Sequence, residues 1–260
     1  MLRREEAMEK IKNIRKKLRH QRSVRRRKLG LSTPTQIICV SFIIVIALGT
    51  LLLTLPIASR HGRLDVLNAM FTATSATCVT GLVVRDTWTQ FTWFGQAVVL
   101  LLIQVGGLGL VTLTSFFALA MRRRMGFRDL RLLGESVSAD GYDQAKSVLK
   151  IVVGLAAMFE GIGILLLLFA FVPQFGLEGV WISVFTAISA FCNAGFDLFG
   201  RFGAYSSLVP YVNNYYVQAV IMFMIISGGL GFMVWVELCQ WYKKRRLSLH
   251  AKVVLSFSVI

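Results

Sequence analysis

The chain has 260 residues, of which 55% are hydrophobic and only 16% are charged, and its mean hydropathy is +0.65. Soluble domains carry about a quarter charged residues, so this composition excludes an ordinary soluble globular protein. The net charge of +16 is not one basic surface, because 13 of the 29 Lys and Arg residues precede Gly30, seven lie between Arg122 and Lys150 and five between Lys243 and Lys252.

These three basic blocks alternate with long apolar runs, as in membrane proteins whose basic segments stay in the cytoplasm. The first block, residues 1–31, is therefore predicted to be a cytoplasmic N-terminal tail. It is too long and too charged for a cleaved secretory signal, and we expect it to bind anionic lipid headgroups. Nucleic-acid binding is not expected, because no aromatic residue interleaves the charges and a spanning segment follows.

The first apolar run, Ile37–Leu55, is long enough for one membrane span and ends at Pro56. A helix is expected over Asp65–Ala76, with Asp65 capping its start, but this helix is too short to cross. The chain must then return to the outer side, because one further span, Phe94–Met121, delivers the next basic block to the cytoplasm. The segment between the two spans is therefore predicted to be a re-entrant loop, which is tolerated only against protein or a water-filled path.

The same series of elements is predicted a second time. Val148–Val172 reads as an outward span ending at Pro173, Leu177–Ala190 as a short re-entrant helix, and Tyr215–Tyr242 as an inward span. Asp140-Gly141 is typical of a turn in the cytoplasmic link. The predicted parts of this all-α, multi-pass membrane protein are a basic tail (1–31), a first helix–pore loop–helix repeat (32–124), a linker (125–146), a second repeat (147–246) and the start of a truncated third (247–260).

A duplicated stretch supports the two repeats. FTATSATCVTGL at Phe71–Leu82 and FTAISAFCNAGF at Phe185–Phe196 share seven identities in register, at an offset of 114 residues. GGLG follows each copy, at Gly106–Gly109 and Gly228–Gly231, at an offset of 122. Repetition at such a period indicates a duplicated structural unit. We expect these glycines to let a neighbouring helix approach closely.

The duplicated stretch also suggests a chemistry. A short helix directs about half a negative charge from its C-terminus, and an extended turn after it can present carbonyl oxygens that replace a cation's hydration water. Gly81 and Gly195 suit a backbone with positive φ or close approach. We therefore predict a carbonyl-lined selectivity filter for a cation, with no cofactor and no transition-metal site, formed by Thr77, Cys78, Val79, Thr80, Gly81, Phe191, Cys192, Asn193, Ala194 and Gly195.

With their spacing, the motifs TxVTGL and FxNAGF, each followed by a GGLG helix, resemble the Trk/Ktr/HKT superfamily of potassium transporters, and most of all the bacterial membrane subunit of Ktr/Trk systems. The resemblance covers the chain from Thr33 to Ile260. It implies four repeats around one K⁺ path, of which this chain carries two, and a place in the bacterial plasma membrane. It also implies a homodimer and a cytosolic nucleotide-binding regulatory subunit. Glycine rather than serine at Gly81 is associated in that family with a preference for K⁺ over Na⁺.

Several polar residues have two readings. Glu160 lies inside a predicted span and is either functional or a hydrogen-bonding partner between helices. Asp86 and Asp197 either attract cations at the mouth of the filter or are solvated loop acids. Gln104 is expected to face the pore loop, and Glu237 to meet Lys243 or Lys244.

The sequence leaves alternatives to K⁺ uptake open. A Na⁺-preferring or weakly selective cation transporter of the same fold is one, and a non-conducting membrane scaffold or regulator is another. An enzyme is not expected, because no nucleophile–base pair or metal-ligand set converges and the three histidines are scattered.

Overall fold

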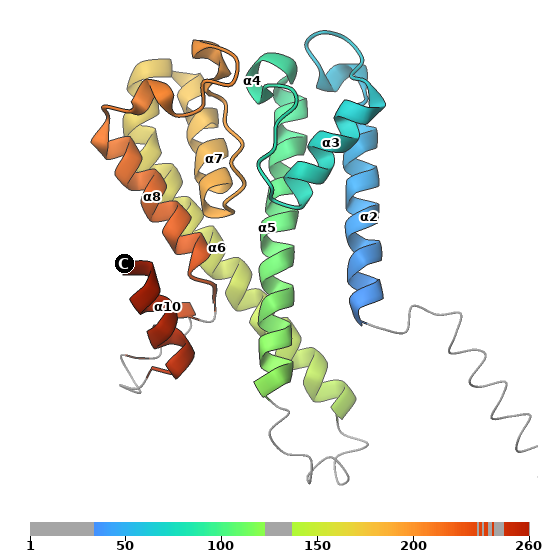
Figure 1. Cartoon of the computed structure of the whole chain (residues 1–260), viewed down its shortest axis with the longest axis vertical. Helices are drawn as coiled ribbons and strands as arrows, with labels where there is room; N and C mark the ends of the chain where they lie inside the picture. The colour runs from blue at the N-terminus through green and yellow to red at the C-terminus, as the bar shows by residue number, and fades with distance from the viewer. Residues whose placement is uncertain are drawn as a thin grey trace, which may run out of the picture. The chain divides into compact units, whose positions relative to one another are not determined.

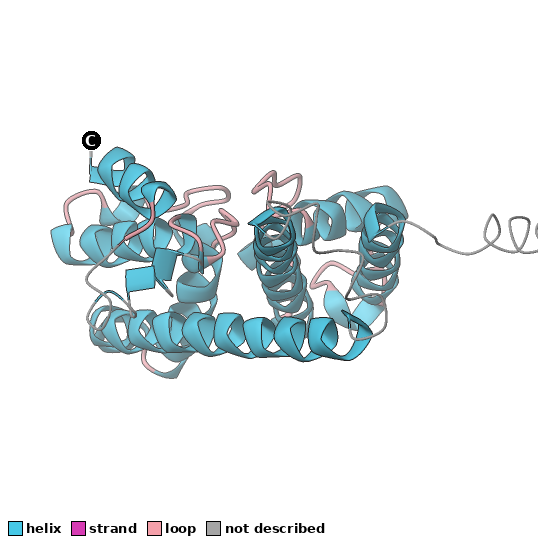
Figure 2. Cartoon of the chain, turned by 90° about the horizontal axis from the view of Figure 1, so that it is seen from below, coloured by secondary structure: helices cyan, strands magenta, loops and turns pink. Residues whose placement is uncertain are grey.

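The computed structural model describes residues 34–122, 137–232, 234, 235, 237, 238, 241 and 247–259. These residues form helices joined by loops (Figure 2), and the sole β contact among them is an isolated bridge between Ser59 and Phe91. The predicted all-helical class is therefore confirmed for the described part of the chain. The basic tail 1–31 and the basic residues 243–246 lie outside the described residues. The chain divides into a unit that ends at Val45 and a unit from Ile46 onward.

The predicted elements of the first repeat are present, with ends shifted by one to three residues. Asp65 occupies the N-cap position of the short helix as predicted, but its side chain makes no capping hydrogen bond, so that part of the expectation is wrong. The carboxylate is exposed, so water solvates it there. The elements are α2 (Pro34–Leu53), η1 (Pro56–Ala58), α3 (Val66–Thr77), α4 (Thr87–Gln90) and α5 (Trp93–Arg122).

The second repeat follows the same plan, with a longer loop between its short helix and its last helix. That loop contains two short 3-10 helices, where the first repeat has only the single turn of α4. The elements are α6 (Val137–Phe175), α7 (Leu177–Phe191), η2 (Phe199–Phe202), η3 (Val209–Tyr211), α8 (Tyr215–Gly229) and α10 (Leu249–Val259).

Helix α6 is longer at both ends than the predicted span. The turn expected at Asp140-Gly141 is wrong, because both residues lie inside α6. A glycine costs a helix only about 1 kcal/mol, so Gly141 alone does not end α6. Pro173 does not end the helix either, since α6 continues to Phe175.

The last predicted span is interrupted. Helix α8 ends at Gly229, and Gly231 has φ +81°, so Tyr215–Tyr242 is not one continuous helix. The first GGLG, in contrast, lies inside α5. In the second repeat, side chains satisfy carbonyls next to the break: the indole nitrogen of Trp235 donates to Ser227 O at 2.9 Å. Leu113, at the equivalent place in the first repeat, has no such donor.

The short helices α3 and α7 pack against the long ones. Helix α3 contacts α5, while α7 contacts α5, α6 and α8. Figure 1 shows α3 and α7 ending partway along the long helices beside them. Among the described residues, one helical stretch, Lys150–Phe175, is long and apolar enough to cross a membrane, and shorter apolar helices lie at 39–53, 93–109, 177–191 and 215–229.

Candidate ion-binding turns

The first turn (Thr77–Gly81) and the second turn (Phe191–Gly195) have the same hydrogen-bond pattern. Cys78 N donates to Thr74 O at 2.8 Å and Thr80 N to Ser75 O at 3.0 Å. The equivalent bonds of the second turn run from Cys192 N to Ile188 O at 2.9 Å and from Ala194 N to Ser189 O at 2.8 Å. Each turn is thus held by the last residues of its own short helix.

The two turns also have the same backbone conformation. Val79 and Asn193 have φ of +56° and +58°, and Gly81 and Gly195 have φ of +74° and +72°. The residue between each pair is not in the left-handed region. Left-handed φ costs most residues with a side chain roughly 1–2 kcal/mol, whereas Asn tolerates it, so the first turn is strained at the β-branched Val79.

The C-terminal ends of the short helices pack closely against the GGLG segments, in agreement with the close approach that the sequence predicts at these glycines. A Cβ on Gly106 would collide with Thr77 O, and a Cβ on Gly228 would collide with Phe191 O. Gly106 lies 13 residues after Trp93, the start of α5, and Gly228 lies 13 residues after Tyr215, the start of α8. At ~1.5 Å per residue, each short helix ends about 20 Å along its neighbour.

The two turns meet at equivalent positions. A Cβ on Gly81 would lie 2.8 Å from Ala194 O and 3.5 Å from the Cα of Gly195. A Cβ on Gly195 would lie 3.4 Å from the Cα of Gly81. The glycines are therefore required for two reasons, the positive φ and the approach of the other turn.

Asp86 links the segments that leave the two turns. It is only 6% exposed, and its two oxygens accept from Thr89 N at 2.8 Å and from Tyr205 N at 3.0 Å. Gly200, its equivalent in the second repeat, lies against the same carboxylate. The expectation of a solvated loop acid is wrong for Asp86, because its carboxylate is buried and accepts bonds from backbone N–H groups.

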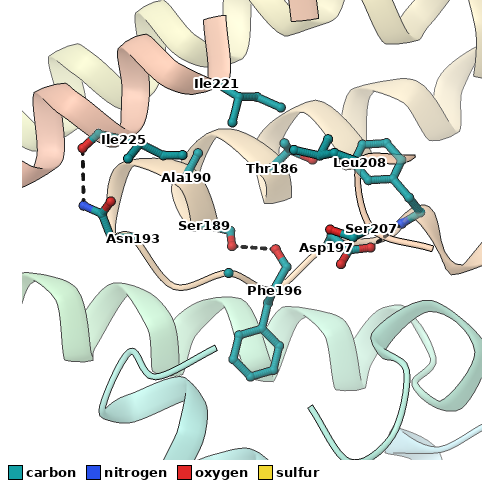
Figure 3. A pocket seen from close by; sticks show the side chains of 12 residues that line it. Thr186, Ser189, Ala190, Asn193, Phe196, Asp197, Ser207, Leu208, Ile221 and Ile225 are labelled. Carbon is teal, nitrogen blue, oxygen red and sulfur yellow. Dashed lines mark hydrogen bonds between the residues drawn. The ribbon is translucent and has the colours of Figure 1, made fainter. Parts of the chain in front are cut away.

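Asp197 differs from Asp86. It is half-buried, and Phe199 N donates to its Oδ1 at 2.9 Å. Burial raises the pKa of this carboxyl, and the neighbouring charge of Asp86 raises the pKa further. Asp197 lines a cavity of about 200 Å³ beside the second turn (Figure 3).

A second cavity of about 240 Å³ lies where both turns begin. Helix α5 borders it, and a Cβ on Gly107 would lie 2.6 Å from the Sγ of Cys192. The second helix of the first repeat therefore packs against the second turn. Residues of both turns line this cavity, namely Cys78, Val79, Phe191, Cys192 and Asn193.

Two hydrogen bonds join α5 to the second repeat. Gln104 Nε2 donates to Glu160 Oε1 at 2.8 Å, so the predicted bonding role of Glu160 between helices is confirmed, and the expectation that Gln104 faces the pore loop is wrong. The other bond was not foreseen: Trp181 Nε1 donates to the Oε1 of the fully buried Gln96 at 2.8 Å. A glutamine within an apolar run could have signalled a buried hydrogen bond.

Glu237 accepts from Ser248 N at 3.1 Å; its expected partners, Lys243 and Lys244, lie outside the described residues. The side-chain hydroxyls of Thr77 and Thr186 are buried, and each lacks a hydrogen-bond partner in the described structure. No pattern in the sequence predicts either unpaired hydroxyl, because such hydroxyls normally bond to the preceding helical turn.

Comparison with known proteins places these features in a family. The TrkH family model, described as a cation transport protein, matches residues 8–259. The potassium/sodium uptake protein NtpJ of Enterococcus hirae is 36% identical over 88% of this chain and 50% of its own length. The Ktr system potassium uptake protein B is 38% identical in Bacillus subtilis, over 86% of this chain and 49% of its own length. Its Vibrio alginolyticus counterpart is 36% identical over 85% and 48%. The chain thus spans about half the length of these relatives.

Proposed function

Since the chain belongs to the TrkH family of cation transport proteins, we propose that it forms part of the ion path of a K⁺ uptake transporter in the bacterial plasma membrane. The two turns supply half of a carbonyl-lined selectivity filter, and they sit on re-entrant loops between the membrane-spanning helices of two tandem repeats. The filter residues are those predicted from the sequence, 77–81 and 191–195.

The contact between equivalent positions carries this proposal. Gly81 lies against Gly195, and Asp86 lies against Gly200. Repeats arranged around a common axis bring equivalent residues together in this way, and an ion path along that axis would be lined by the same atoms of each repeat. Two packed helices that were alike only in composition would have no reason to bring these positions together.

The position of the turns fits a filter inside the membrane. Each turn begins about 20 Å along the neighbouring helix, which is within the ~30 Å hydrocarbon core. Irregular backbone at that depth requires protein packing or a water-filled path. Carbonyl oxygens can replace the hydration shell of a K⁺ ion there, and the ends of α3 and α7 add partial negative charge.

A complete filter needs more carbonyls than two turns provide. Relatives named potassium uptake proteins are about twice as long as the chain, which supports two further repeats in the working pore. We propose that the pore-forming protein is a homodimer that binds a cytosolic nucleotide-binding regulatory subunit, and that the basic residues of 1–31 hold anionic lipid. The name "Ktr system" in two relatives supports an assembly of more than one component.

Replacing Gly81 by Ser tests the proposal. The new Cβ faces Ala194 O and strains a φ of +74°, so the turn must shift and its carbonyls must leave their K⁺ positions. We expect the ratio of K⁺ to Na⁺ uptake to fall about tenfold, equivalent to about 1.4 kcal/mol. Uptake would be measured with the natural protein in cells that lack other K⁺ uptake systems.

Gly62→Ser is the matched control. Gly62 has φ +85° on an outer loop, with nothing within 4 Å of a Cβ, so this variant carries the same backbone strain without a neighbouring turn. Its ion preference should equal that of the unmodified protein. An unchanged ratio in a conducting Gly81→Ser protein would contradict the filter assignment.

A weakly selective cation transporter is the second candidate. One relative is named a potassium/sodium uptake protein. In that case the unmodified protein would take up Na⁺ about as fast as K⁺, and the same uptake assay separates the two.

A further inference from the structure

The cavity of about 200 Å³ beside the second turn has a largely apolar wall into which a few polar side chains are set. It lies between α7, α8 and the outer loop that follows the turn (Figure 3). Ile221 and Ile225 of α8 form its apolar side, while Thr186, Asp197 and Ser207 bring oxygens to it. Space of this size holds a small ion together with several waters, since one water takes about 30 Å³.

Thr186 lines this cavity with an unsatisfied hydroxyl. The residue is only 6% exposed, and its Oγ1 has no hydrogen-bond partner among the described residues. A buried hydroxyl without a partner costs about 1–3 kcal/mol, so an occupant of the cavity that bonds to it would recover that free energy.

The first repeat lacks the unpaired hydroxyl and the carboxylate of this cavity. Thr72, the equivalent of Thr186, donates its hydroxyl to Asn68 O at 2.9 Å. The equivalent of Asp197 is Val83, and that of Asn193 is Val79. The polar cavity is therefore a feature of the second repeat and not a consequence of the shared turn geometry.

Asp197 supplies a negative charge without a described cationic partner. Its carboxylate accepts from Phe199 N, and Ser207 also hydrogen-bonds to it. The ion pair found among the described residues joins Arg201 to Glu178 instead. Ser207 has φ +47°, a strained conformation for a residue with a side chain, and such strain is common at binding sites.

We propose that this cavity is a binding site for a monovalent cation, held by the carboxylate of Asp197 and the hydroxyls of Thr186 and Ser207. It borders the proposed filter at Asn193 and Gly195, but its ligands are side-chain oxygens and not the filter carbonyls. A single carboxylate with neutral oxygens suits a monovalent ion, whereas Ca²⁺ sites collect several carboxylates. The other nearby carboxylate, Asp86, is occupied by two backbone N–H groups.

Thallium(I) can test this site, because it substitutes for K⁺ and scatters X-rays anomalously. Crystals of the natural protein grown with Tl⁺ should show anomalous density between Thr186, Asp197 and Ser207, separate from any density at the turns. Asp197→Asn should abolish the side density. Thr186→Val, which removes only the hydroxyl from a shape of the same size, should weaken it. Thr72→Val, the matched change in the first repeat, should leave it unchanged.

The outcomes separate this site from the filter. Density at the turns alone, with ordinary water in the cavity, would overturn the side site and leave the proposed function standing. Density in the cavity alone would support the side site and count against the filter. If Asp197→Asn does not fold, the comparison of Thr186→Val with Thr72→Val decides: equal side density in both variants overturns the proposal.

Discussion

The first and second turns share one backbone but are supported differently. In the first, the hydroxyl of Thr80 donates to the hydroxyl of Ser75 at 2.9 Å. In the second, Ala194 replaces Thr80, and Ser189, the equivalent of Ser75, donates to Phe196 O at 2.5 Å. In the first repeat this serine thus accepts a side-chain hydrogen bond from its own turn, whereas in the second repeat it donates to the segment that follows the turn. Backbone bonds at each helix end define the turn, and side chains set its surroundings.

The loops that follow the two turns differ as well. The offset between the repeats grows from 114 residues at the turns to 122 at the GGLG segments, so eight extra residues lie between them in the second repeat. They form part of the loop with η2 and η3, which supplies Tyr205 to Asp86 and Ser207 to Asp197. The longer loop therefore builds both the link between the repeats and the proposed side site.

The largest effect is expected where both repeats use the same contact. Gly106→Val and Gly228→Val each place a side chain into a backbone carbonyl, and overpacking of this kind costs about 3 kcal/mol. Folded protein measured by size-exclusion chromatography of membrane extracts should fall severely for both. Gly161→Val is the control, because a Cβ there meets nothing within 4 Å. A well-folded Gly106→Val protein would break the claimed equivalence of the repeats.

The loss of the link between the loops that follow the two turns should have the next largest effect. Asp86→Ala leaves the N–H groups of Thr89 and Tyr205 without an acceptor. This should lower the free energy of unfolding by about 3 kcal/mol. The thermal midpoint of the purified protein should drop by several degrees. Asp65→Ala is the matched control, since Asp65 is exposed and makes no capping bond; equal midpoints for both variants would show that the link does not stabilise the fold.

A smaller effect is expected where α5 meets the second short helix. Trp181→Phe removes the donor to Gln96 Oε1, which is fully buried. The loss should lower the free energy of unfolding by about 2 kcal/mol. Trp93→Phe is the control: Trp93 stacks on Trp181 with ring centroids 5.4 Å apart, and phenylalanine keeps a stacked ring. In urea or thermal unfolding, Trp181→Phe should be less stable than Trp93→Phe. The reverse order of stability would contradict a stabilising role of the bond between Trp181 and Gln96.

The smallest effect is expected on the stability of the loop that contains η2 and η3, at alkaline pH. Tyr211 donates to Gln174 Oε1 at 2.7 Å, and burial raises the pKa of its phenol to about 12, although the charge of Arg201 lowers it. The folded state thus holds this proton more tightly than the unfolded chain, so the stabilisation is complete below about pH 10 and is lost as the pH rises toward 12. Between about pH 10 and pH 12 the thermal midpoint of Tyr211→Phe should fall less with rising pH than that of the unmodified protein. Thermal midpoints measured at stepped pH check this.

The sequence predicted the elements of both repeats because apolar runs, basic blocks and the duplicated stretch all constrain them. It could not predict the break in α8, because the same GGLG sequence stays helical in α5 and the difference depends on donors such as Trp235, brought in by tertiary packing. Nor could it show that Asp86 is buried. That depends on Gly200 and Tyr205, more than a hundred residues away, and on a loop whose path no local pattern specifies.

The central claim is that the two turns belong to one filter. The measurement that tests it most directly is K⁺ and Na⁺ uptake by Gly195→Ser alongside Gly81→Ser, in the natural protein. Since the two glycines lie against each other with nearly equal φ, both variants should lower the preference for K⁺. If Gly195→Ser changed only the amount of folded protein while Gly81→Ser changed ion preference, the two turns would not form one filter.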